Sequence, residues 1–169
     1  SLSAAQRAHI IGVQANLWAE GIPSRSRMLY MYFPRILALA ELAWTQPAQK
    51  DYDDFYGRLR QQLSMLNRLG VPYRIPSLDG FYNVNAFTDK GTLTVECQDP
   101  QAVIRYTTDG TTPTASSAKV PSGTSISIPV GTTTLKVGLL IGSAVTGIIT
   151  RTYTVTEDLT NATMTLKVT

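Results

Sequence analysis

The first seventy or so residues show apolar positions at helical spacing. After Asp51 an apolar stripe recurs every three or four residues, at Phe55, Leu59, Leu63, Leu66 and Leu69. Asp51 is a good N-cap, while Gly70 and Pro72 favour an end to the helix. A preceding helix is predicted to begin at Pro34 and to run to Trp44. Because it is apolar on nearly every side, we expect it to be buried against something large.

Residues 11–18 alternate as a strand does. One side would carry Ile11, Val13, Ala15 and Leu17, and the other would carry Gly12, Gln14, Asn16 and Trp18. The first side suits packing against helices. The second side is polar and ends in an aromatic residue, with Glu20 just beyond it. This is typical of a parallel barrel strand, at whose carboxyl end catalytic and binding residues lie.

The second half of the chain has the period-two pattern of short strands. Strands are predicted over 92–97, 103–107, 133–141, 144–156 and 163–168. Asp99–Pro100 and Asp109–Gly110 are turn signals, and Gly142–Ser143 suits a two-residue hairpin turn. About seven short strands indicate an all-β, immunoglobulin or fibronectin-III-like sandwich.

Composition divides the chain at the same place. Residues 1–80 contain one threonine, Thr45, whereas residues 81–169 contain twenty-one. Threonine suits a half-exposed pleated surface, so this shift supports a helical part followed by a β part. We predict one unit over 1–76, a linker over 77–81 and a sandwich over 82–169.

Charge and rare residues limit the chemistry. The formal net charge of +3 is too small and too scattered to predict nucleic-acid binding, and no apolar run is long enough for a membrane span. A single cysteine, Cys97, excludes an internal disulfide, and a single histidine, His9, excludes a histidine-rich metal cluster. No cofactor or metal is expected.

One strand and two helices cannot close a barrel, so residues 1–76 look like a piece of a larger domain. The blocks GVQANLWAE at 12–20, YMYFPRILALAELAW at 30–44, KDYDDFYGRL at 50–59 and LGVPYR at 69–74 resemble the end of the catalytic barrel in β-N-acetylhexosaminidases of glycoside hydrolase family 20. IRYTTDGTTPTASS at 104–117 and TTTLKVGLL at 132–140 resemble the small β-sandwich at the C-terminus of chitobiase-like members. The fold class expected is therefore the last strand and helices of a (β/α)8 TIM barrel, followed by the sandwich.

The resemblance implies an activity for the parent enzyme. Family members remove a terminal N-acetylglucosamine or N-acetylgalactosamine by a substrate-assisted retaining mechanism, in which an Asp-Glu pair assists the substrate's acetamido group. Residues 1–80 contain no Asp-Glu dipeptide, and Glu157–Asp158 has the reverse order. We therefore expect no catalytic residue in this chain, and the chain alone to be inactive. By resemblance, Trp18 forms an aromatic wall against the sugar and Glu20 accepts hydrogen bonds from its O4 and O6 hydroxyls.

Simpler interpretations stay open. Trp18 could be barrel core, and Glu20 could be a solvated loop acid. The rival function is a stand-alone carbohydrate-binding or interaction module, although the second half has no tryptophan. Tyr106, Tyr153 and Phe87 are expected in the sandwich core. The chain is also expected to self-associate through exposed barrel surface, and the family predicts export, to a bacterial periplasm or cell surface.

Overall fold

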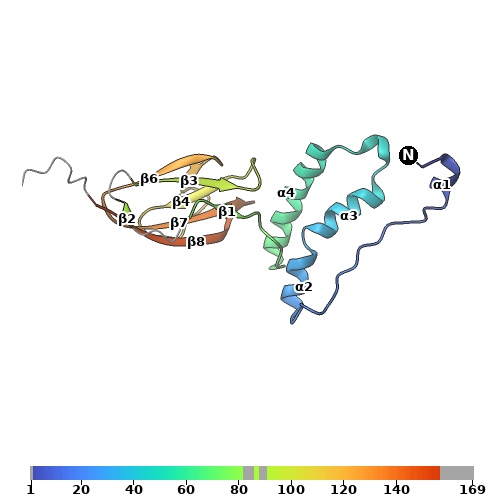
Figure 1. Cartoon of the computed structure of the whole chain (residues 1–169), viewed down its shortest axis with the longest axis horizontal. Helices are drawn as coiled ribbons and strands as arrows, with labels where there is room; N and C mark the ends of the chain where they lie inside the picture. The colour runs from blue at the N-terminus through green and yellow to red at the C-terminus, as the bar shows by residue number, and fades with distance from the viewer. Residues whose placement is uncertain (1, 82–85, 88–90, 157–169) are drawn as a thin grey trace, which may run out of the picture. The chain divides into compact units, whose positions relative to one another are not determined.

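The computed structural model describes residues 2–81, 86–87 and 91–156. It divides into two compact units, with the division between Arg74 and Ile75. Figure 1 shows helices in the first unit and strands in the second.

The first unit is built from helices, with a long irregular segment between α1 and α2. Its helices are α1 (Ala4–Ala8), α2 (Arg25–Tyr32), α3 (Arg35–Trp44), the 3₁₀ turn η1 (Pro47–Gln49) and α4 (Tyr52–Arg68). The predicted N-cap of α4 is confirmed, because the Asp51 carboxylate accepts a hydrogen bond from the Asp54 N–H at 2.8 Å. Gly70 follows the end of α4 with φ 63°, a conformation that glycine adopts without strain.

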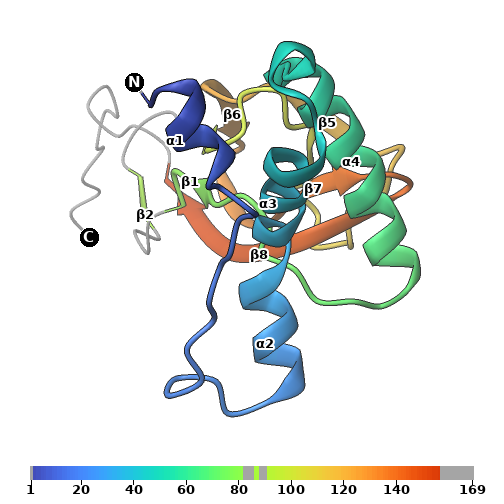
Figure 2. The ribbon, with the colours of Figure 1, turned by 90° about the vertical axis from the view of Figure 1, so that its right-hand side faces the viewer.

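The predicted strand over 11–18 does not form. The segment between α1 and α2 contains no strand and is drawn as a loop in both views (Figures 1 and 2). A parallel barrel strand is held by neighbouring strands on both sides, and no described residue of the chain pairs with this segment. The alternating pattern is therefore not enough to form a strand here, because a strand also needs a neighbouring strand to pair with.

The second unit consists of two sheets. Its strands are β1 (Leu78–Asp79), β2 (Ala86–Phe87), β3 (Gly91–Cys97), β4 (Ile104–Thr107), β5 (Ala118–Val120), β6 (Thr124–Ile128), β7 (Gly131–Ile141) and β8 (Ala144–Val155). One sheet has the order β1-β3-β6 and the other has the order β2-β8-β7-β4-β5. All pairs are antiparallel except β2 with β8. Figure 1 shows β3 and β6 in one layer and β7 and β8 in the other.

The core lies between these two sheets. Val95 on β3, Ile104 on β4, Leu135 and Val137 on β7, and Tyr153 on β8 are fully buried. Buried and exposed residues alternate along β3, and buried and partly buried residues alternate over residues 133–137 of β7, which is the pattern of a sheet with one face on a core. The structure thus confirms the expected helical part followed by a mainly antiparallel sandwich.

A predicted two-residue turn joins β7 to β8. The hairpin between β7 and β8 turns at Gly142–Ser143 as expected, with Gly142 at φ 66°, as the first position of a type II′ turn requires. The expected linker over 77–81 contains β1, whose Leu78 pairs with Cys97. The strand expected over 163–168 lies outside the described residues.

Candidate functional site

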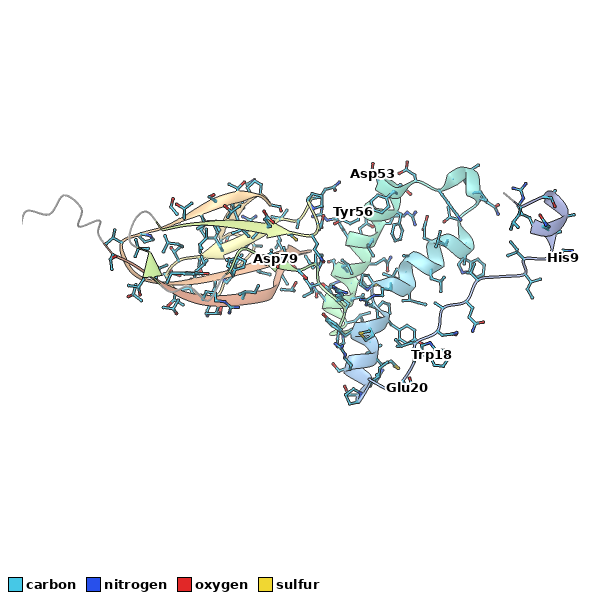
Figure 3. All side chains as sticks on the ribbon, in the orientation of Figure 1. His9, Trp18, Glu20, Asp53, Tyr56 and Asp79 are labelled. Carbon is cyan, nitrogen blue, oxygen red and sulfur yellow. The ribbon has the colours of Figure 1, made fainter. Side chains whose placement is uncertain are left out.

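The two residues expected to bind sugar lie on the extended segment before α2. Trp18 is 75% exposed, and Glu20 is exposed in the turn that follows. Figure 3 shows both side chains near the start of α2. Trp18 is exposed in a unit that also exposes Ile11, Leu42 and Trp44, so its exposure does not distinguish a wall of a sugar site from a place in the core of a barrel. The sugar-binding roles of both residues stay predictions.

Two polar side chains that the alternation places on one side of this segment do lie together. The Gln14 amide donates a hydrogen bond to the Asn16 side-chain oxygen at 2.6 Å. Side chains two positions apart in an extended backbone point to the same side, so they can meet without any strand partner. The hydrogen bond places the Gln14 and Asn16 side chains together on this segment.

The first unit exposes an unusually large apolar surface. Its exposed large apolar side chains include Ile10 (57%), Ile11 (101%), Val13 (54%), Leu42 (58%), Trp44 (87%) and Leu69 (66%). Its only buried apolar residues among those described are Leu63, Leu66 and Tyr73. Helix α3 forms as predicted, yet none of its residues is buried. Three buried side chains are too few to form the core of an independent unit of this size.

A charged contact that the sequence did not predict joins α3 and α4. Both Glu41 carboxylate oxygens accept hydrogen bonds from Arg58, at 2.8 and 2.9 Å. Thr45 also donates its hydroxyl to Glu41, at 2.9 Å. The Arg58 guanidinium, and secondarily the Thr45 hydroxyl, hold the pKa of Glu41 below its ordinary value. Separation by 17 residues in sequence leaves no local signal for this pair, so only the packing of the two helices reveals it.

The sandwich offers no aromatic binding platform in its described part. Tyr153 is buried, and Phe81 and Tyr106 are partly buried against the core, so the predicted core roles of Tyr106 and Tyr153 are confirmed. The Phe87 side chain lies outside what the structure describes. Asp109 has a turn role: the Thr111 hydroxyl and backbone N–H donate to it and lower its pKa. Burial raises the pKa of the partly buried Cys97 thiol.

The described residues contain neither a metal-binding cluster nor a membrane-spanning helix. Within the described ranges, no group of three or more histidine, cysteine, aspartate or glutamate side chains is placed to hold a metal ion. None of the helices in that part of the chain combines the length and the hydropathy of a membrane span.

Two family models match the chain in an order that agrees with its two units. Residues 1–47 match the catalytic domain of glycosyl hydrolase family 20, and residues 83–144 match the chitobiase/beta-hexosaminidase C-terminal domain. The chain joins the C-terminal part of a family 20 catalytic domain to a chitobiase-type C-terminal domain. Trp18 and Glu20 lie within the part that matches the catalytic domain.

Individual relatives agree with this assignment. The chain is 41% identical over 119 residues to a beta-hexosaminidase of Porphyromonas gingivalis, which covers 69% of the chain and 15% of that protein. It is 41% identical over 61 residues to a beta-N-acetylhexosaminidase of Cellulomonas fimi, over 36% of the chain and 12% of that protein. An N,N'-diacetylchitobiase of Vibrio harveyi is 28% identical over 123 residues, 59% of the chain and 13% of that protein. The chain thus spans a small part of the length of these curated relatives.

Proposed function

We propose that this chain is the C-terminal part of a β-N-acetylhexosaminidase that removes terminal N-acetylglucosamine or N-acetylgalactosamine from glycans. The observation that carries the proposal is the order of its two matches, the end of a family 20 catalytic domain followed by a chitobiase-type domain. The exposed apolar surface of the first unit supports it, because the rest of a (β/α)8 barrel would cover α3 and pair with residues 11–18.

The proposed mechanism assigns the chain a binding role. The acetamido oxygen of the substrate attacks the anomeric carbon while the bond to the leaving-group oxygen breaks, and the Glu of an Asp-Glu pair in the preceding part of the barrel protonates that oxygen. The Asp orients the acetamido group, and the Glu then takes a proton from the water that attacks the anomeric carbon and releases the sugar with retention. Residues 1–80 contain no such pair, so the chain alone is inactive. Trp18 packs its indole face on the C–H face of the sugar, and Glu20 accepts hydrogen bonds from the O4 and O6 hydroxyls. These contacts hold the sugar in its reactive pose.

The role of Glu20 is tested in the whole enzyme. This enzyme is expressed from the gene that includes the coding sequence upstream of this chain. Glu20→Gln keeps the shape but removes the charge of the acceptor. One charged hydrogen bond contributes about 1.5–3 kcal/mol, so kcat/KM on an aryl N-acetyl-β-glucosaminide should fall about ten- to a hundredfold. Glu96→Gln, the same change at an exposed carboxylate on β3, is the matched control.

Substrate analogues sharpen this test. Removal of the 4- or 6-hydroxyl from the sugar should slow the wild-type enzyme but should have little further effect on Glu20→Gln. Unchanged kinetics in Glu20→Gln would remove Glu20 from the subsite. If the upstream sequence holds no Asp-Glu pair near a strand end, the enzyme proposal itself fails.

The proposal includes export of the whole protein, to a bacterial periplasm or cell surface. Its support is the family resemblance alone. Fractionation of the source cells with an antibody to the sandwich tests it, and recovery of the protein in the cytosol only would contradict it.

A further inference from the structure

The charged residues of the sandwich are sorted between its two sheets. Over the described residues 75–156, the acidic side chains Asp79, Glu96 and Asp99 lie on β1, on β3 and in the turn after β3. The four basic side chains lie on the five-stranded sheet, at Arg105, Lys119, Lys136 and Arg151. Asp109, in the turn after β4, already accepts two hydrogen bonds from Thr111. The two sheets therefore carry opposite charge.

Three of the four cations lie together on the outer face of the five-stranded sheet. Their neighbours along each strand, Ile104, Val120, Leu135 and Val137, are buried in the core, so the alternation of the strands turns the cations outward. Arg105 lies directly opposite Lys119, which places their Cβ atoms about 4.5–5.5 Å apart. Lys136 is a diagonal neighbour of Arg105, at about 7–8 Å. We call Arg105, Lys119 and Lys136 the cationic patch.

No carboxylate in the described part of the chain forms an ion pair with this patch, and Asp109, which is bridged to Thr134 two residues before Lys136, accepts its hydrogen bonds from Thr111. The ion pairs found there both involve Arg58, in the first unit. Arg105 donates from one terminal nitrogen to the Ser117 carbonyl, at 2.6 Å, while its Nε is buried without a partner. Like charges directly opposite each other in a sheet destabilise it. A bound anion would remove this repulsion, which gives the patch a physical reason to bind one.

Among the described residues of this face, hydroxyl groups surround the patch and exposed aromatic rings do not. The outward positions of β4, β7 and β8 carry Thr107, Thr132, Thr134, Thr150, Thr152 and Thr154. Without an exposed ring among the described residues of this face, neither nucleobases nor neutral sugars can stack there. Three basic residues are also fewer than the four to eight that membrane-binding clusters use.

We propose that the outer face of the five-stranded sheet binds a polyanionic glycan, with sulfate or carboxylate groups on the cationic patch. Lys119 and Lys136 supply ammonium donors to these groups, the Arg105 guanidinium adds its charge and its second terminal nitrogen, and the threonine hydroxyls can bond to sugar hydroxyls between them. The choice of a glycan rests on the proposed function, which brings this sheet to glycan chains. The sandwich would then hold the enzyme on acidic glycans while the barrel cleaves their ends.

The experiment measures binding of the full 169-residue chain to chondroitin sulfate at low ionic strength, by calorimetric titration. Separate titrations use neutral chitin oligosaccharide, a DNA duplex and vesicles that contain phosphatidylserine. The test variant is Lys119→Gln with Lys136→Gln. The matched control is Arg60→Gln with Arg68→Gln, two exposed cations of α4, which changes the net charge equally.

The expected result is binding of chondroitin sulfate that weakens with added salt. The Lys119/Lys136 variant should lose about tenfold in affinity and the Arg60/Arg68 variant should lose little. No binding by the wild-type chain, equal losses in both variants, or binding of DNA or vesicles as tight as that of the glycan overturns the proposal. Activity of the whole enzyme on a neutral aryl glycoside is a separate readout, so failure here and failure of the proposed function are distinguishable.

Discussion

At the scale of single residues, backbone geometry explains two glycines of the sandwich. Gly80, just after β1, has φ 97°, and Gly123, just before β6, has φ 79°. A Cβ on Gly80 would collide with the Thr94 carbonyl oxygen of β3, whereas a Cβ on Gly123 would meet nothing within 4 Å. Both positions thus require a left-handed backbone, but only Gly80 is also required by a close approach of two chain segments.

This difference predicts unequal effects of the same substitution. Gly123→Ala should lower the free energy of unfolding of the sandwich by about 1–2 kcal/mol, the cost of the left-handed conformation. Gly80→Ala should lower it by about 1–3 kcal/mol more, since β1 must move away from β3. Urea unfolding followed by far-ultraviolet circular dichroism gives both values, and equal losses would contradict the predicted collision.

At the scale of elements, helices α3 and α4 were predicted from local signals, but their contact was not. Apolar spacing and the Asp51 cap identified α4, because both depend only on neighbours in sequence. Helix α2 was missed, although Ser24 caps it by accepting from the Arg27 N–H at 3.1 Å, and a serine N-cap is a signal that sequence can carry. The Glu41–Arg58 pair depends on how α3 and α4 pack.

That pair predicts a dependence on pH. The pKa of Glu41 is lowered in the folded chain, so its stabilising contribution is present above the ordinary value of 4.5 and is lost as the pH falls through the lowered value. A double-mutant cycle with Glu41→Gln and Arg58→Gln, followed by the helical circular dichroism signal, should show coupling at neutral pH. The coupling should vanish in acid, and a coupling independent of pH would contradict the assigned ion pair.

At the scale of the whole molecule, the two units differ in completeness. The sandwich buries side chains from β3, β4, β6, β7 and β8 in one core, whereas the first unit leaves Ile11, Leu42 and Trp44 exposed. Exposed apolar surface of this extent is typical of an interface. The proposed function supplies the occupant, the preceding part of the barrel.

The isolated chain should therefore associate with itself and bind an apolar dye, and it should show no hexosaminidase activity. Leu42→Ser with Trp44→Ser should reduce both association and dye binding. Val130→Ser, at a 61% exposed position of the sandwich, is the control and should change neither. Light scattering after size-exclusion chromatography measures association, and a monomer that binds no dye would contradict the interpretation.

Sequence by itself determined the division into a helical and a β part, the caps and turns, and the family, because each depends on neighbouring residues or on blocks in a fixed order. Tertiary structure decided which predicted elements form. Residues 11–18 have the alternation of a strand but lack the partners that a strand requires, so their pattern alone could not show whether a strand forms. The pairing of Arg105 with Lys119 also became visible only in the sheet, since register brings together residues that the sequence keeps 14 positions apart.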